Sequence, residues 1–169
     1  AINKGFTFIE LLLAMAVIGI FAILISFYTN ITFKNLQAKQ LADQSIAYAK
    51  YFSDYINYNK NLISSLIKEN DSIIVSLDGL PGAINIPVPK TFTKSNIYGQ
   101  MPCLSITKNT SGKLFPMLFY VGGSSDKHIA QKAALMLGAK GGYQDKNKDN
   151  SYVVRSSGGW EIEIGRASC

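Results

Sequence analysis

The residues with the most specific chemistry lie at the start of the chain, where a single carboxylate stands at the head of a long apolar run. Glu10 is the only charged residue between Phe6 and Tyr28, and residues 11–25 are apolar apart from Gly19. A run of this length and composition can cross a bilayer as a helix. A carboxylate at the centre of such a helix costs roughly 2.5–3.5 kcal/mol. Glu10 therefore either lies at the headgroups, where it costs little, or has a partner that compensates its charge.

The two cysteines, Cys103 and Cys169, fit a single disulfide formed in an oxidising compartment. By chain entropy alone, a bridge between them would contribute on the order of 4 kcal/mol, less any strain. The alternatives are two free thiols, or a Cys169 that pairs elsewhere because the natural chain is longer. No other residues have metal-ligand spacing, so we predict neither a zinc site nor any other metal site.

Three further candidate sites are more simply explained by structure than by chemistry. Residues 145–150 place oxygen ligands at alternate positions, but the loop lacks the glycine of a calcium loop, and Ser156 stands where a bidentate Glu is needed. We expect a solvated turn there. His128, the only histidine, has no nucleophile pattern around it and is expected at the surface. The glycine pairs at 122–123, 141–142 and 158–159 match no phosphate-binding motif and indicate turns with positive φ. We predict no enzymatic activity and no cofactor.

The charges of the chain are dispersed. Its 169 residues carry a net charge of +6, with 17 Lys and Arg against 11 Asp and Glu. The lysines are scattered and form no basic run, which indicates a solvated mixed surface rather than a nucleic-acid partner.

The elements that must position these residues begin with one long helix, expected from about Phe6 to about Ile56. No Pro or Gly interrupts residues 21–77. The front half of the helix is apolar all round, and its back half is amphipathic. One line on the back half consists of small and apolar residues: Leu41, Ser45, Ala49, Phe52 and Ile56. A neighbouring line consists of Tyr48, Tyr51, Tyr55 and Tyr58, which we expect to pack in the core and at its rim.

The remaining sequence predicts a small α+β head with an antiparallel sheet. Pro116 inside one expected strand indicates an edge position or a bulge. The helix expected at residues 127–137 would be capped by Ser125 or Asp126 and ended by Gly138. A short second helix is expected near residues 62–67, and strands are expected at residues 72–77, 103–107, 114–121, 152–155 and 160–164. A polar loop is expected between Gly142 and the last two strands. The predicted divisions are residues 1–5, 6–56 and 57–169.

The N-terminal pattern resembles the processing site of type IV pilins and pseudopilins. In that family a basic leader ends in Gly, and the mature chain begins with an N-methylated residue, commonly Phe, with Glu at its fifth position. The resemblance implies that residues 1–5 are a leader remnant, that a prepilin peptidase cuts after Gly5, and that Phe6 is the methylated N-terminus. Glu10 would then be the assembly residue. The proline that many pilins carry midway along this helix is absent. The resemblance also implies a type IV pilin fold.

The cleavage would give Glu10 its partner. It would free an ammonium on Phe6, and in a stack of such helices the Phe6 amine of a neighbouring subunit is the cation most readily available to a buried Glu10. An unpaired buried carboxylate is strongly destabilising, whereas a paired and hydrogen-bonded one is tolerated. The pair would therefore penalise wrong alignments of subunits.

A second resemblance is to the constant N-terminal region of shufflon-type minor pilins of type IVb systems. It rests on four segments that occur in order, at residues 91–100, 121–123, 138–142 and 158–160. In that family the constant region continues into an exchangeable C-terminal segment that selects the recipient. The resemblance therefore implies that this sequence holds the constant part only, or that it is a short relative ending in a cysteine.

These resemblances imply a minor pilin of a type IVb pilus that primes assembly or sits at the tip and supports adhesion, conjugation or secretion. The implied partners are other pilin subunits, with a homo-oligomer as one form of assembly, the prepilin peptidase and the inner-membrane assembly platform, with no nucleic acid. The protein would lie in the bacterial inner membrane and then in a pilus on the cell surface. The alternatives are the major pilin of the same filament, a pseudopilin of a type II secretion system, and an adhesin or lectin head that uses the tyrosine line.

Overall fold

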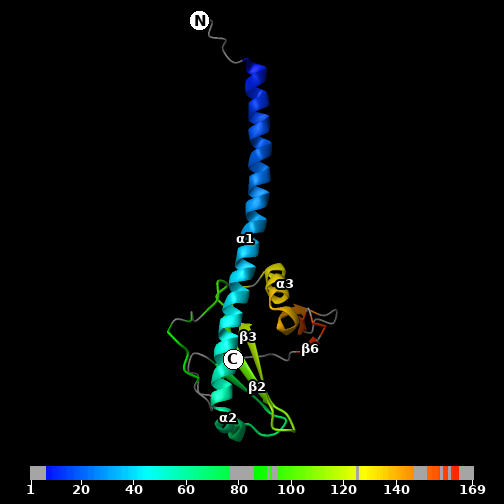
Figure 1. Cartoon of the computed structure of the whole chain (residues 1–169). Helices are drawn as coiled ribbons and strands as arrows, with labels where there is room; N and C mark the ends of the chain where they lie inside the picture. Colours follow the sequence, from blue (N-terminus) through cyan, green and yellow to red (C-terminus); the bar gives the residue numbers. More distant parts are fainter. Residues whose placement is uncertain are drawn as a thin grey trace. The chain divides into compact units, whose positions relative to one another are not determined.

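The structure is a computed structural model of the 169-residue chain, and it forms two compact units, Ala1–Leu36 and Gln37–Cys169. It describes residues 7–76, 86–90, 92, 95–124, 126–146, 152–156, 158–159 and 161–163. For residues 76, 145–146, 152 and 161–163 only the backbone is described. The two units are described separately below, and Figure 1 gives the element labels.

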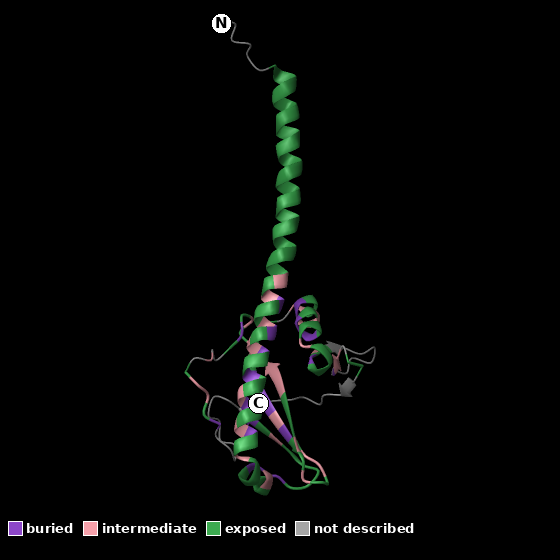
Figure 2. Cartoon of the chain, in the orientation of Figure 1, coloured by how far each residue is buried: buried purple, intermediate pink, exposed green. Residues whose placement is uncertain are grey.

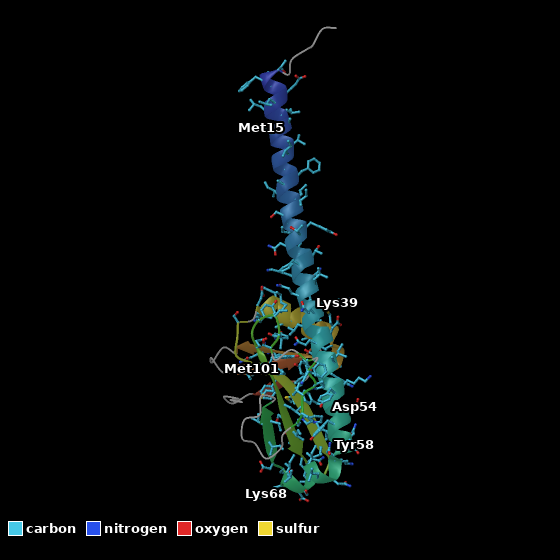
Figure 3. The ribbon with its side chains drawn as sticks, turned by 90° about the vertical axis from the view of Figure 1, so that its left-hand side faces the viewer. Met15, Lys39, Asp54, Tyr58, Lys68 and Met101 are labelled. Carbon is cyan, nitrogen blue, oxygen red and sulfur yellow. The ribbon has the colours of Figure 1, made fainter. Side chains whose placement is uncertain are left out.

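The first unit holds the front part of helix α1 (Phe8–Tyr58, 51 residues). Residues 7–34 are exposed along their whole length, which Figure 2 shows as unbroken green. Their apolar side chains point away from the helix on all sides, as Met15 does in Figure 3. An 18-residue window of α1 has a mean hydropathy of 2.8 and no buried residue, so by length and composition this helix can cross a membrane. The helix continues through Gly19 without a break.

In the second unit the back half of α1 supplies one wall of the core. Its buried residues recur every three or four positions and are Ala38, Ala42, Ser45, Tyr48, Phe52 and Ile56. The predicted line is therefore correct for Ser45, Phe52 and Ile56. It is wrong at Ala49, which is exposed, because the buried face is turned toward Tyr48. Burying the large ring of Tyr48 removes far more apolar area from water than burying one alanine methyl.

The main sheet lies against this wall. The short helix α2 (Lys60–Leu66) leads into β1 (Ser72–Ser76), β2 (Met101–Lys108) and β3 (Leu114–Val121), which pair antiparallel in the order β1-β2-β3. Val75, Leu104 and Leu118 are aligned across the strands and face the α1 residues of the core. Pro116 lies in β3, which pairs with β2 alone among the described strands, so the edge position is confirmed of the two predicted explanations.

A second sheet corrects the prediction for the C-terminal third. Strands β4 (Gly142–Lys146), β5 (Tyr152–Ser156) and β6 (Glu161–Glu163) pair antiparallel in the order β4-β5-β6, separately from the first sheet. The expected polar loop after Gly142 was wrong, because its first residues form β4. Gly-Tyr-Gln-Asp-Lys has neither alternation nor β-branched residues, so its strand conformation follows from pairing with β5 rather than from local preference.

Helix α3 (Lys127–Met136) precedes the short 3₁₀ helix η1 (Gly138–Lys140) and begins at a cap that the sequence predicted. The Asp126 carboxylate accepts a hydrogen bond from the His128 N–H at 2.9 Å. Ile129 and Ala133 of α3 pack with Ala38 and Ala42 of α1 in a cluster of their own.

Gly141 lets the chain turn from α3 into β4. A Cβ at Gly141 would lie 2.3 Å from the carbonyl oxygen of Ala134, closer than any real contact, so only glycine fits. The expected α+β fold, a long N-terminal helix followed by a head of antiparallel strands and further helices, is confirmed.

Candidate functional site

The predicted site residues fall into two groups. Gly5, Phe6 and Cys169 lie outside the described residues, so the structure does not test the cleavage site or the predicted pairing of the cysteines. Glu10 lies in the first turn of α1, and Cys103 lies in β2. The site that can be built from contacts is therefore the beginning of α1.

Glu10 is held by Thr7 through three hydrogen bonds. The Thr7 backbone N–H donates to Glu10 Oε2 at 2.8 Å, and the Thr7 hydroxyl donates to the same oxygen at 3.0 Å. In return, the Glu10 backbone N–H lies 3.4 Å from Thr7 Oγ1 and donates to it. The first helical bond, from the Leu11 N–H to the Thr7 carbonyl, is 3.2 Å long. This reciprocal arrangement is a capping box, in which a Thr and a Glu three residues later satisfy each other's backbone donors.

The capping box fixes the carboxylate at the positive end of a 51-residue helix. A negative charge at a helix N-terminus is favourable, because it faces backbone N–H groups that have no carbonyl partner. The carboxylate also stays next to position 6, because Thr7 follows Phe6 directly in the chain. An ammonium group on a mature N-terminal Phe6 would thus stand within the same short segment as the anion.

Thr7 is a functional residue that the sequence interpretation missed. The signal was present, since a Ser or Thr, two further residues and a Glu directly before an apolar run is typical of a capping box. The charge of Glu10 by itself does not reveal this pairing. The contacts give it a second role, as the residue that begins the helix.

Cys103 is buried and takes part in a disulfide. It faces away from α1, because its neighbour Leu104 points into the core and successive residues of a strand alternate. Across the sheet it stands opposite Phe119. The disulfide is thus located on the outer face of the first sheet.

The tyrosine line of α1 packs as expected for Tyr48, Tyr51 and Tyr55, but not for Tyr58. Tyr48 is buried, with its ring stacked on Phe92 at a centroid distance of 4.6 Å. The Tyr51 hydroxyl donates to the Pro87 carbonyl. Tyr58, at the end of the line, is exposed, as Figure 3 shows. These contacts give the adhesin alternative no concave aromatic site on the described part of this helix.

A partly buried polar pair joins the same face of α1 to β3. Ser45 Oγ and Tyr120 Oη form a hydrogen bond at 3.3 Å. Burial raises the pKa of Tyr120 to about 12. The Tyr120 hydroxyl is therefore neutral at physiological pH and serves as a hydrogen-bonding group in the core.

The geometry of the described residues gives no support to the candidate metal and histidine sites. Within the described residues, no three His, Cys, Asp or Glu side chains come together as metal ligands. Most of the 145–150 loop lies outside those residues. His128 is exposed beside the cap of α3, as expected.

Replacement of Thr7 by Ala should loosen the first turn of α1, because the Glu10 carboxylate loses one of its two donors, the hydroxyl, and the Glu10 N–H loses its acceptor. Loss of an N-cap side chain costs about 0.5–2 kcal/mol. In detergent micelles we expect amide hydrogen exchange over residues 8–11 to become faster in Thr7→Ala and to stay near wild type in Thr7→Ser, which keeps the hydroxyl. Equal exchange in all three proteins would show that the capping box does not form.

The comparisons with known proteins point to the same segment. Residues 2–26 match the family model described as the prokaryotic N-terminal methylation motif, which includes Gly5, Phe6 and the whole capping box. No curated protein and no solved structure matches the chain significantly. The motif, together with an apolar helix able to cross a membrane, supports a type IV pilin-like structural subunit with a prepilin-type N-terminus.

Proposed function

We propose that this protein is a structural subunit of a type IVb pilus, made as a prepilin and used as a minor pilin. The observation that carries the proposal is the capped Glu10 at the head of a stretch, residues 11–33, that has no charged side chain. The stretch lies on a helix that can cross a membrane, and its first half lies inside the matched methylation motif.

The chemistry of maturation follows from this segment. A prepilin peptidase would cut the bond between Gly5 and Phe6, and N-methylation of Phe6 would follow. The apolar part of α1 would hold the subunit in the inner membrane until the assembly platform transfers it into a growing filament on the cell surface. The mature protein would consist of the helix and the head, predicted as residues 6–56 and 57–169.

Glu10 would have a role both in the single subunit and in the assembled filament. In the single chain, Thr7 supplies two donors to Oε2. A carboxylate has about four acceptor positions on its two oxygens, so an ammonium can bind without displacing the cap. In a filament, where the helix would leave the bilayer and be surrounded by other apolar helices, the Phe6 ammonium of a neighbouring subunit would then pair with Glu10.

The minor-pilin assignment rests on sequence segments rather than on the helix. Four segments of the head, at residues 91–100, 121–123, 138–142 and 158–160, occur in the order found in the constant region of shufflon-type minor pilins. A bond from Cys103 to Cys169 would complete the head by tying its C-terminal part to the first sheet, in keeping with an oxidising compartment. Low-copy subunits of this kind would prime assembly or sit at the tip, in adhesion, conjugation or secretion.

Replacement of Glu10 by Gln separates the effect of the negative charge from the effect of the capping box. Gln at this position keeps a capping box, so membrane insertion and the start of α1 should be unchanged. The pairing with the Phe6 ammonium is lost, and we expect incorporation into sheared filaments to fall at least about tenfold, which corresponds to about 1.4 kcal/mol. Quantitative immunoblots of the filament and membrane fractions measure the ratio.

Two matched variants complete this test. Thr7→Ala removes the cap and keeps the charge, whereas Glu10→Val removes both. If Glu10→Gln assembles like wild type while Glu10→Val does not, the capping box and not the ion pair is the requirement, and the pairing proposal is wrong.

Replacement of Gly5 by Val should block maturation, because a branched side chain is placed at the bond that the peptidase must cleave. Co-expression with a prepilin peptidase and intact-mass analysis should show loss of the leader and a gain of one methyl group in wild type, with neither change in Gly5→Val. The same product masses in both proteins would place the cleavage elsewhere.

Immunogold labelling of purified filaments tests the function itself. A minor pilin predicts sparse labels or labels at the tip, while the major pilin predicts labels along the whole shaft. Absence of label from surface filaments, with the protein retained in the cell envelope, would favour a pseudopilin and contradict the proposal.

A further inference from the structure

We propose that strand β3 is an interaction edge, on which the β3 strand of a second copy of this chain pairs antiparallel. The pairing would join two heads into one continuous sheet with the order β1-β2-β3-β3-β2-β1. This inference rests on the proposed function for the membrane anchor that holds two copies together. It goes beyond that function, because it assigns the part of the head that meets a second copy.

The backbone groups of β3 on the side away from β2 are open. Alternate residues of a strand direct both of their backbone groups to the same side. Lys108 of β2 uses its N–H and C=O to bond Asp71 and Asn70, which lead into β1. Its register partner Leu114 therefore directs its own groups to the open side of β3, and so does Leu118. Within the described residues, neither leucine has a backbone hydrogen-bond partner on that side. The edge can thus accept a further strand.

Strand β3 lacks the features that usually protect an edge. Edge strands are normally short or carry charged side chains. Strand β3 is eight residues long and contains no charged residue, and the protective feature it does have is Pro116 near its beginning. The other described edge strands, β1, β4 and β6, have five, five and three residues, and β4 and β6 contain charges. An uncharged edge as long as β3 is a template for pairing with another chain.

The outer face of β3, which is directed away from α1, is apolar as well. Leu118 packs against the core, so by alternation this face consists of Phe115, Met117, Phe119 and Val121. Phe115 is 47% exposed and Met117 42% exposed, and Figure 2 shows this beginning of β3 in green. Cross-strand neighbours on one face lie about 4.5–5.5 Å apart. A second strand would therefore cover these side chains and remove apolar area from water.

A second β3 fits this edge better than the charged edges of the same chain. Pairing with β4 or β6 would bring carboxylates to an apolar strand, where they lose water. The charge nearest to β3 in the sequence is Lys113, whose ammonium lies 5.4 Å from the centre of the Phe115 ring. Antiparallel pairing at the middle of the strands separates the two Lys113 residues by at least about 26 Å, eight residues at about 3.3 Å each. Self-pairing therefore brings no like charges together.

The area of such a contact indicates where it forms. Stable interfaces between free proteins bury about 1,200–2,000 Å², and two eight-residue strands meet along one edge only. Tethering raises the effective concentration of two weakly interacting surfaces. The apolar helix that can cross a membrane supplies such a tether. We therefore expect the pairing between copies anchored in one membrane and not between dilute, separated chains.

Photo-crosslinking of the full chain in membranes tests this pairing. Phe115 is replaced by the photoreactive p-benzoylphenylalanine, which keeps an aromatic ring and leaves both cysteines unchanged. Membranes are irradiated, and the dimer band is digested and analysed by mass spectrometry. We expect links to residues 119–121 of the second copy, because antiparallel strands paired at their middle place Phe115 opposite Phe119 or Val121.

The positions of the lysines make the assignment to two copies unambiguous. Trypsin cuts after Lys113 and Lys127, and no Lys or Arg lies between them. The probe and its expected target are therefore in the same peptide, residues 114–127. A link between two of these peptides can only join two copies of the chain.

Met117 and Ile74 provide a matched pair of variants. Both are in register with Ser105 of β2, with exposures of 42% and 43%, but Ile74 lies on β1, at the other edge of the sheet. In the chain that carries the probe, Met117→Lys places a charge in the paired strands and should lower the dimer yield at least about tenfold. Ile74→Lys should leave the yield near that of the parent chain. Circular dichroism of both variants shows whether the fold is retained.

Several outcomes would overturn the inference. Absence of the dimer band, with the chain recovered in membranes and in filaments, removes the pairing and leaves the proposed function intact. Links from position 115 to a different protein, or to another element of a second copy, assign the edge to another occupant. An equal loss of dimer in Met117→Lys and Ile74→Lys shows that the edge of β3 is not the contact. Recovery of the full chain outside the membrane fraction contradicts the anchor, and with it the proposed function.

Discussion

The structure depends on one constraint, that a carboxylate inside an apolar helix must always have partners. Glu10 stands at the head of a stretch without any other charge, and Thr7 gives it two donors within its own turn. This solution is local, so it holds in any surroundings of the helix. It also leaves the carboxylate able to accept a cation, which a filament of such helices would have to supply. A single side chain thus begins the helix and would set the register between subunits.

The front and back parts of α1 are suited to different surroundings. Residues 7–34 are exposed and largely apolar, which is unfavourable in water and favourable in a bilayer or among like helices. From Ala38 onward, one face is buried under the sheet and α3 while the exposed remainder carries charged side chains such as Lys39, Asp43 and Lys50.

Much of the fold was predictable because its signals are local. The long helix, the edge strand with Pro116 and the Asp126 cap of α3 all follow from patterns within a few residues. The predictions that were wrong concern contacts between residues far apart in the chain. Strand β4 forms because β5 pairs with it, and the buried line on α1 includes Tyr48 in place of Ala49 because Phe92 meets the tyrosine ring from a distant loop. Thr7 also has a local signal, because a Thr three residues before a Glu at the head of an apolar run is typical of a capping box.

The sequence by itself determined the chemistry of the N-terminus, because a lone acid before an apolar run, a glycine before a phenylalanine and a basic residue before both are properties of the order of residues. It also determined the kind of each element wherever periodicity was strong. Only the tertiary structure decided that the strands divide into two separate sheets, that Cys103 faces away from α1, and that Leu135 and Met136 remain exposed beside lysines. These features depend on which surfaces meet, and residues far apart in the chain compete for the same core. A linear pattern contains no information on the outcome of that competition.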